Sequence, residues 1–340
     1  MRNIFFPAEW YPQSAVQIAW PHSKSDWRDY LDEVKACYLS ISREILKRQK
    51  LLIVCPDEDE IRSLFASNEQ QNLITVTCPS NDTWVRDYAA ISVFENNIPT
   101  LIDFGFNGWG LKFPAHYDNR IASCLHQKKL FCPNVAYSNQ HRFILEGGAI
   151  ETDGEGTLLT TSCCLLAPNR NQPMSKKQIE EHLCQTLGVH RVLWLDYGHL
   201  EGDDTDGHID TLARFCDTQT IAYVSCDDET DTHFAELKKM EQQLQTFTDA
   251  KGKPYRLVAL PMADVVMENG ERLPATYANF LIINDAVLVP FYNSKKDEVA
   301  RSQLQSLFPD RDVVGVDCRA LIRQHGSLHC ITMQFPKGFL

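Results

Sequence analysis

The sequence lacks any apolar run that approaches the roughly 20 residues needed to span a bilayer as a helix. It also lacks a surplus of basic residues, because 33 Lys and Arg stand against 45 Asp and Glu and leave a net charge of −12. Such a chain has no excess cation to neutralise phosphates, so we expect no nucleic-acid partner and no membrane partner. None of the 12 cysteines forms a C-x-x-C pair, which argues against a structural zinc site.

The N-terminus lacks the basic segment and apolar stretch of a signal peptide. Linkers, low-complexity tracts and long charge runs are absent as well, so we expect a single domain over residues 1–340. Several cysteines, such as Cys55 and Cys216, lie inside apolar runs. Free buried cysteines are typical of a reducing compartment, and we therefore expect a cytoplasmic protein. The acidic charge weakly favours a small cationic ligand, although solubility alone also accounts for it.

A repeated pattern is the main positive signal in the chain. Four segments read as β-hairpins with turn residues at the tip, namely residues 87–104, 146–161, 208–226 and 277–292. Helical spacing of apolar residues separates them, over residues 30–49, 175–187, 232–246 and 296–307. A further strand follows most helices, and residues 16–22 and 329–335 supply the fragments that would complete a fifth copy. The pattern predicts an α/β fold of about five repeated units closed around an axis.

The hairpins begin with reactive side chains at nearly even intervals along the chain. Asp87, Glu146, His208 with Asp210, and Cys330 each open a short apolar run. If the units surround an axis, these side chains meet at a common centre. His208 and Asp210 lie two residues apart on a predicted strand, so they should face the same way, and the carboxylate could hold the imidazole protonated.

Core packing is the ordinary interpretation of a cysteine before an apolar strand. The place of Cys330 in the repeat and the polar approach at Gly326 and Ser327 favour a nucleophile instead. Several converging carboxylates repel one another unless a cation lies among them, and a planar guanidinium fits them well. Trp84 and Trp109 could stack on that plane, although core packing explains them equally well.

Seven segments in order resemble the agmatine deiminases, which belong to the guanidine-modifying superfamily together with the arginine and peptidylarginine deiminases. The segments are residues 81–87, 104–110, 145–161, 165–171, 203–215, 273–293 and 325–334. The resemblance covers nearly the whole chain. It implies the pentein α/β-propeller, with five ββαβ-type units around a pseudo-fivefold axis.

The resemblance also implies roles for individual residues. Cys330 would attack the guanidinium carbon, and His208 would act as the general acid and base. Asp87 and Asp210 would bind the guanidinium nitrogens, with Glu146 near the same centre to support His208 or the substrate.

Asp204 matches an acidic position that the family uses for substrate binding, here at the distal ammonium of agmatine. Loss of ammonia would leave an amidino-cysteine, which water would convert to N-carbamoylputrescine, a polyamine precursor. No cofactor is needed, because the thiol, the acid/base and the carboxylates suffice. One departure stands out: many family members carry a glycine-rich run where this chain has residues 324–327, and these bulkier residues should affect specificity and rate.

Three alternatives remain open at this stage. A deiminase for arginine or peptidyl-arginine would need a basic or open site, and Arg86 or Arg170 could serve there. A metal-dependent hydrolase could use His208, Asp210 and Asp87. A binding module for polyamines would bind without turnover. The sequence is also compatible with a homo-oligomer and does not decide the matter.

Overall fold

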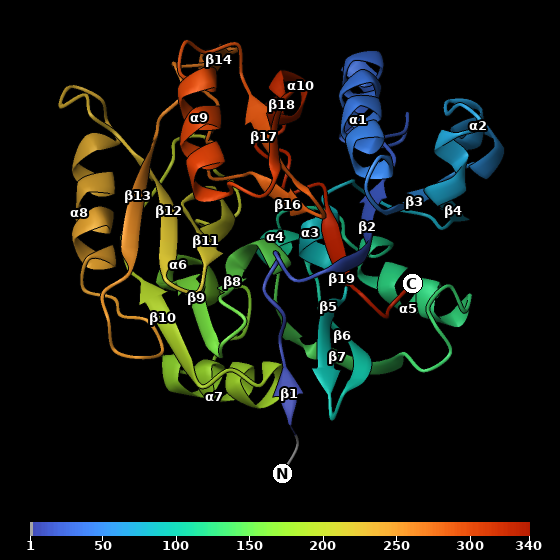
Figure 1. Cartoon of the computed structure of the whole chain (residues 1–340), viewed down its shortest axis with the longest axis horizontal. Helices are drawn as coiled ribbons and strands as arrows, with labels where there is room; N and C mark the ends of the chain where they lie inside the picture. Colours follow the sequence, from blue (N-terminus) through green and yellow to red (C-terminus); the bar gives the residue numbers. More distant parts are fainter. Residues whose placement is uncertain (1–2) are drawn as a thin grey trace.

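The computed structural model describes residues 3–340 and shows an α/β chain in which short sheets alternate with helices. Within those residues the strands form five sheets of three or four strands and one ribbon of β14 (Met267–Glu268) with β15 (Glu271–Arg272). In Figure 1 the longer helices lie around the rim, whereas the turns α3 (Val85–Tyr88) and α4 (Gly108–Leu111) lie near the middle. The centre of the molecule is thus built from short turns.

Three sheets repeat the predicted unit of a hairpin, a helix and a third strand. In each sheet the hairpin strands pair antiparallel, and the third strand pairs parallel with the second. A parallel partner needs a crossover connection, which a helix supplies here. The strands are β8 (Ile150–Thr152), β9 (Thr157–Thr161) and β10 (Arg191–Leu195); β11 (Ala213–Asp217), β12 (Thr220–Ser225) and β13 (Arg256–Pro261); and β16 (Leu281–Ile283), β17 (Ala286–Phe291) and β18 (Asp312–Asp317). The crossover helices are α7 (Lys176–Leu187), α8 (Phe234–Leu244) and α9 (Asp297–Leu307). A short turn, α6 (Ser162–Leu165), precedes α7.

The remaining two sheets contain four strands each and include the ends of the described chain. One of them has the order β1-β5-β6-β7, and the other has the order β19-β2-β3-β4. In the latter sheet β19 pairs antiparallel with β2, so the first and last parts of the chain share one sheet, as the repeat pattern predicted. The strands are β1 (Ile4–Phe5), β2 (Gln13–Ala19), β3 (Lys50–Cys55), β4 (Leu73–Thr77), β5 (Ile91–Glu95), β6 (Ile98–Gly105), β7 (Ala136–Ile144) and β19 (Met333–Pro336). The helices between them are α1 (Leu31–Leu46), α2 (Glu58–Ser63) and α5 (Ile121–Gln127).

The predicted helix over residues 175–187 is confirmed, together with the signals that begin and end it. The Ser175 side chain accepts a hydrogen bond from the Gln178 backbone, and the Gln178 side chain accepts one from the Ser175 backbone. This reciprocal pair satisfies two donors that the first turn leaves free. Gly188 ends the helix at φ 73°, a left-handed conformation that glycine adopts without a steric penalty. The three other predicted helices are also present, as α1, α8 and α9.

The prediction that His208 and Asp210 lie on a strand is wrong. The chain forms a one-turn 3-10 helix, η5 (Ile209–Thr211), before β11 begins at Ala213. The hydroxyl of Thr211 donates to the carbonyl of His208 at 2.8 Å and closes this turn. A comparable turn, η4 (Gly147–Ala149), follows Glu146, and α3 contains Asp87. The reactive residues therefore sit on short turns that lead into the hairpins, not on the strands themselves.

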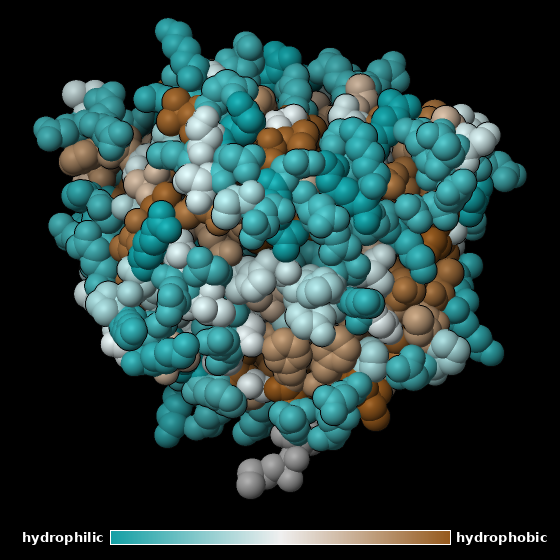
Figure 2. Space-filling model, viewed as in Figure 1, coloured by the Kyte–Doolittle hydropathy of each residue, from teal (hydrophilic) through white to brown (hydrophobic). Residues whose placement is uncertain are grey.

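Apolar residues fill the space between sheets and helices in two buried clusters, a large one and a smaller one around β11, β12 and α8. The face shown in Figure 2 is mostly hydrophilic, with apolar residues in scattered patches. In residues 3–340 no helix combines the length and the apolar character that crossing a membrane requires.

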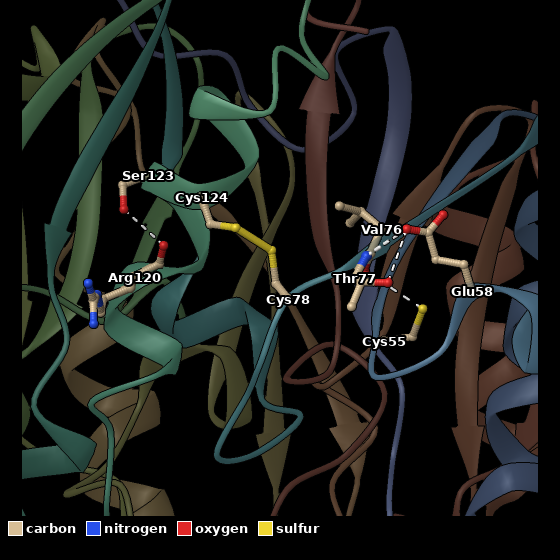
Figure 3. The surroundings of a disulfide bond; sticks show 8 residues. All are labelled: Cys55, Glu58, Val76, Thr77, Cys78, Arg120, Ser123 and Cys124. Carbon is tan, nitrogen blue, oxygen red and sulfur yellow. Dashed lines mark hydrogen bonds between the residues drawn. A yellow bond between two sulfur atoms is a disulfide. The ribbon is translucent and has the colours of Figure 1, made fainter.

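Two of the cysteines are paired, and no sequence pattern indicated this. Figure 3 shows that Cys78, directly after β4, forms a disulfide with Cys124 of α5. The bond links two sheets across 46 residues of sequence. In the described chain the other ten cysteines are free, Cys330 among them. Sequence spacing indicated nothing about this pair, because its members meet only after the two sheets have packed.

Candidate active site

One cavity of about 380 Å³ collects residues from the turns before the hairpins and from the segment that precedes β19. Six predicted site residues line it, and these are Trp84, Asp87, Trp109, Asp204, His208 and Cys330. The other two, Glu146 and Asp210, are fully buried, and Asp210 lies against the cavity-lining Cys330, with its Oδ2 at 3.7 Å from Sγ. Residues that are far apart in the sequence are thus brought to one centre, as predicted.

Cys330 lies in the turn between α10 (Arg319–Ile322) and β19, and it is almost fully buried. Its Sγ is 3.2 Å from Nδ2 of Asn279 and 3.7 Å from Oδ2 of Asp210. Burial raises the pKa of the Cys330 thiol well above its ordinary value, and the charges of Asp210 and Asp87 raise it further. The thiol is therefore neutral without substrate, and a cation beside it would favour the nucleophilic thiolate.

Asn279 was missed at the sequence level, although it begins the fourth hairpin in the register of the other reactive residues. Its Oδ1 accepts hydrogen bonds from the backbone N–H of His329 at 2.9 Å and of Cys330 at 3.4 Å. Its Nδ2 donates to the backbone carbonyl of Asp210 at 3.3 Å. One amide side chain thus connects the cysteine turn with the turn that carries Asp210.

His208 directly precedes η5 and is 1% exposed. Its Nδ1 is 3.6 Å from Oδ1 of Asp87. Its Nε2 is buried and has no hydrogen-bond partner among residues 3–340. A buried polar atom without a partner is unfavourable unless something else binds it, so this nitrogen is available for a substrate or for a proton transfer.

Asp87 is held by two donors from different parts of the chain. The indole Nε1 of Trp109 donates to Oδ2 at 2.9 Å, and the backbone N–H of Gly148 donates to Oδ1 at 3.0 Å. Burial raises the pKa of Asp87 to about 6, with a further rise from Asp210, whereas His208 and the Trp109 hydrogen bond oppose the shift. A nearby cation would restore the ionised form.

The backbone around Trp109 is unusual. Four consecutive residues have positive φ: 70° at Gly108, 55° at Trp109, 82° at Gly110 and 70° at Leu111. A left-handed conformation costs about 1–2 kcal/mol for a residue with a side chain, and two of these four residues carry one. Such strain commonly occurs at functional sites, and here the turn aims the indole N–H at Asp87.

Within residues 3–340, one carboxylate oxygen of Asp210 accepts hydrogen bonds and the other accepts none. Its Oδ2 lies 2.7 Å from Nδ1 of His329, whereas Oδ1 is buried and accepts no hydrogen bond within residues 3–340. Burial would raise the pKa of Asp210, but the hydrogen bond and the charge of His329 lower it overall. The carboxylate is therefore ionised and has an unused acceptor, as a residue that binds a guanidinium would require.

Glu146 is paired with Arg170 and does not line the cavity. Nε of Arg170 lies 3.0 Å from both carboxylate oxygens, and neither side chain is exposed. Arg170 also donates to Asp206 at 2.6 Å, so it joins Glu146 to the loop that contains Asp204. A carboxylate oxygen of Glu146 also lies within 4.8 Å of a ring nitrogen of His208, which agrees with the predicted place of Glu146 beside His208.

A second group of carboxylates lines the same cavity. It consists of Asp26, Asp82, Asp203 and Asp204. Burial raises the pKa of Asp82 to about 7, and the charges of Asp26 and Asp204 add to the effect. Burial likewise raises the pKa of Asp204, against the opposing charges of His325 and Lys112. Asp82 was missed at the sequence level, although it lies in the segment that contains Trp84 and Asp87.

Trp84 packs against Trp27, with ring centroids 5.5 Å apart, and also lines the cavity. Gly326 lies directly on its ring, because a Cβ at this position would come within 2.2 Å of the indole. The neighbouring Gln324 and His325 also line the cavity. The segment that departs from the glycine-rich family pattern therefore forms part of the cavity wall. Its one glycine, Gly326, lies where a side chain would collide with the Trp84 ring.

Two buried groups of side chains have donor atoms close enough to bind a metal ion. They are Glu146 with Cys164 and His208, and Glu9 with Glu151 and His329. In both groups an arginine already faces a carboxylate: Arg170 faces Glu146, and Arg214 faces Glu9 and Glu151. Within residues 3–340 the predicted trio of His208, Asp210 and Asp87 is not such a group. The carboxylates of both groups are thus already paired with arginine side chains of the chain itself.

Comparison with known proteins places the chain in a family. A sequence profile of the Porphyromonas-type peptidyl-arginine deiminases matches residues 5–336. The chain belongs to this family. The agmatine deiminase of Stutzerimonas stutzeri is 32% identical to it, over 99% of this chain and 97% of that protein. The resemblance drawn from the seven sequence segments is therefore confirmed.

Solved structures of similar proteins agree closely with this deiminase. A C. jejuni agmatine deiminase, with one cysteine changed to serine and substrate bound, is 39% identical with a TM-score of 0.92 and covers 100% of this chain and 98% of its own. A Porphyromonas gingivalis protein, provisionally named an arginine deiminase, is 54% identical with a TM-score of 0.97 and covers 99% of this chain and 100% of its own. The family thus includes members named for different guanidinium substrates.

Proposed function

We propose that this deiminase hydrolyses the guanidinium of agmatine to N-carbamoylputrescine and ammonia. The observation that carries the proposal is one cavity with two anionic groups. Asp87 lines it near the Cys330 thiol, with Asp210 directly behind, and Asp82 with Asp204 forms the second group. Agmatine is a dication with a guanidinium and an ammonium at opposite ends of a butyl chain. Each end would neutralise one group of carboxylates in the cavity.

The reaction divides into two steps at the same carbon. The guanidinium binds to Asp87 and to the free Oδ1 of Asp210, and its charge lowers the pKa of the Cys330 thiol. His208 accepts the thiol proton and the thiolate sulfur bonds to the guanidinium carbon. The C–N bond then breaks as His208 passes that proton to the departing nitrogen, which leaves as ammonia. Water, deprotonated by His208, attacks the amidino-cysteine, the S–C bond breaks, and the product carries a urea group. Glu146 supports His208 from behind the cavity.

Arginine is the second candidate substrate, because the 54% identical neighbour carries that name. An α-carboxylate would need a free cation, but Arg86 is buried against Glu9, and Arg170 is bound to Glu146 and Asp206. Arg323 does line the cavity, yet it already pairs with Glu268 and Glu33. The acidic wall supports agmatine over arginine or a peptidyl-arginine.

We also infer that residues 1–340 act as one catalytic domain with the closed, fivefold arrangement of a pentein propeller. The five sheets of the described chain, and the pairing of β19 with β2, support this arrangement. The residues that line the cavity include those of the turns before β5, β11 and β19, which belong to three different sheets, so no single part of the chain forms the cavity alone.

Ammonia release from agmatine, arginine and a peptidyl-arginine, measured side by side, tests the proposal. We expect release from agmatine, and none from Cys330→Ala, which should keep its fold because only one small atom is removed. Cys226→Ala, a cysteine outside the cavity, is the matched control and should retain activity. Release from arginine or the peptide alone would overturn the substrate, and activity in Cys330→Ala would overturn the covalent mechanism.

A further inference from the structure

Behind the cavity, the imidazole of His329 lies between two carboxylates. Its Nδ1 is 2.7 Å from Oδ2 of Asp210, and its Nε2 is 2.7 Å from Oε2 of Glu9. All three side chains are buried. Neither His329 nor Glu9 lines the cavity, so this row of side chains reaches the site from behind, through Asp210.

Both carboxylates in this row are ionised. Glu9 also accepts hydrogen bonds from Nη2 of Arg214 at 2.9 Å and from the backbone N–H of Ile282 at 2.7 Å. Burial alone would raise the pKa of both carboxyl groups, but the charge of Arg214 acts to lower that of Glu9 and also that of Asp210. An ionised carboxylate can only accept a hydrogen bond. Both ring nitrogens of His329 must therefore donate.

A neutral imidazole donates from one nitrogen only. His329 between Glu9 and Asp210 therefore carries both protons and a positive charge. That charge favours the ionised form of Asp210 despite complete burial. The same contact occupies Oδ2 and leaves Oδ1 as the free acceptor. Glu9 accepts a hydrogen bond from Nε2 of His329 and thereby favours the doubly protonated ring. The orientation and the charge of Asp210 depend on that ring, which contacts it through Nδ1.

We propose that Glu9 is a positioning residue of this deiminase, which acts through His329 to keep Asp210 ionised and oriented toward the guanidinium. The inference rests on the proposed function, because Asp210 is there assigned to bind the guanidinium. Glu9 belongs to the segment before β2, for which the sequence pattern indicated no catalytic contribution. Its side chain does not touch the cavity, so its effect is indirect.

Glu151 provides a matched control within the same network. It is buried, acidic and bonded to Nε of Arg214, the arginine that also binds Glu9. In the described chain it makes no hydrogen bond to His329. Removing its charge therefore disturbs the buried network but leaves both ring contacts of His329 intact.

The charged groups packed around His329 come from several elements. Those that bear on its protonation are Glu9 before β2, Asp210 on η5, Glu151 on β8, Arg214 on β11 and Arg86 on α3. Among residues 3–340, only Glu9 and Asp210 contact the ring nitrogens within 3 Å, at 2.7 Å each. A change at Glu9 should therefore affect Asp210 more than an equal change of charge at Glu151.

The test compares Glu9→Gln with Glu151→Gln in the full-length enzyme, with ammonia release from agmatine followed against pH. In Glu9→Gln the ring loses an anionic partner and its second proton, so the pKa of Asp210 rises. We expect kcat/KM to fall about tenfold or more, as for other residues that orient a functional side chain. The acid limb of the pH profile should move to higher pH. In Glu151→Gln that limb should stay in place.

An unmoved acid limb in Glu9→Gln, or equal shifts in both variants, would overturn the proposal and make Glu9 a structural residue. If Glu9→Gln does not fold, nitrogen NMR of histidine-labelled wild-type protein decides the question. Two protonated ring nitrogens on His329 support the proposal, and one unprotonated nitrogen overturns it. Absence of turnover by the wild-type enzyme would instead refute the proposed function, and the NMR result would not depend on it.

Discussion

The indole N–H of Trp109 donates a hydrogen bond to Oδ2 of Asp87 across 2.9 Å. The sequence suggested that Trp109 either stacks on a substrate or packs in the core. The structure adds a polar function, because the indole and the backbone of Gly148 together orient the carboxylate. Asp87 is buried and its pKa is raised to about 6, so its ionisation depends on these donors and on a cation.

Replacing Trp109 with Phe should weaken catalysis without removing the ring. Loss of the N–H raises the pKa of Asp87 above its value of about 6, so the acid limb of kcat/KM should move to higher pH. At neutral pH we expect kcat/KM to fall about tenfold, which corresponds to about 1.4 kcal/mol. The measurement is a pH–rate profile. Trp194→Phe, which removes an indole donor to Glu180 outside the cavity, should leave the profile unchanged.

Binding of agmatine should release protons near neutral pH. Without substrate, burial raises the pKa of Asp82 to about 7 and that of Asp87 to about 6, so both are partly protonated there. A bound dication favours the ionised carboxylates, and release should decline as the pH rises above both values. Calorimetry of Cys330→Ala in buffers of different ionisation enthalpy measures the effect. Asp82→Asn should release fewer protons, and equal release would exclude Asp82 as a source.

Two adjacent aspartates should behave differently when they are changed to Asn. Asp204 lines the cavity with Asp82, so Asp204→Asn should raise KM for agmatine more than it lowers kcat. Asp203 lines the cavity too, but its carboxylate also accepts hydrogen bonds from the Thr205 hydroxyl at 2.6 Å and the Gly207 backbone at 2.7 Å. Asp203→Asn should therefore lower the melting temperature more than Asp204→Asn does. Steady-state kinetics and thermal unfolding test both, and an unchanged KM would remove Asp204 from the substrate site.

Gly148→Ala should abolish most of the activity. A Cβ at this position would lie 2.6 Å from Nδ1 of His208 and 2.8 Å from Oδ1 of Asp87, closer than nonbonded atoms approach. Either side chain must move, and a displacement of about 1 Å at a reacting group can lower the rate about a hundredfold. Ammonia release is the measurement. Gly252→Ala, where a Cβ meets nothing within 4 Å but φ is +76°, should lower stability and leave turnover near normal, so it is the control for activity. Near-normal turnover in Gly148→Ala would contradict the arrangement.

The sequence pattern predicted most of the secondary structure and the meeting of the reactive residues. The hairpin tips and the helix that begins after Ser175 follow from local signals, whereas the shared sheet of β19 and β2 follows from the repeat of one unit along the chain. Turn residues, capping residues and apolar spacing act over a few residues, so the sequence shows them directly. The likeness to agmatine deiminases followed from motifs in a fixed order.

The errors came from contacts between distant parts of the chain. The turn after His208 was expected to be a strand, because apolar spacing over a few residues does not distinguish the two. The disulfide of Cys78 with Cys124 depends on two sheets that pack together. The contacts of Asn279 with Cys330 likewise join segments 51 residues apart.

The sequence by itself determined the α/β repeat, the reactive residue types and the family, because periodicity and motif order are properties of the linear chain. Only the tertiary structure decided which groups share a proton or a charge. It placed His329 between Glu9 and Asp210, paired Glu146 with Arg170, and left Oδ1 of Asp210 without a hydrogen-bond partner in the described part of the chain. Burial and the contacts of distant side chains determine protonation and orientation, and both exist only once the chain has folded.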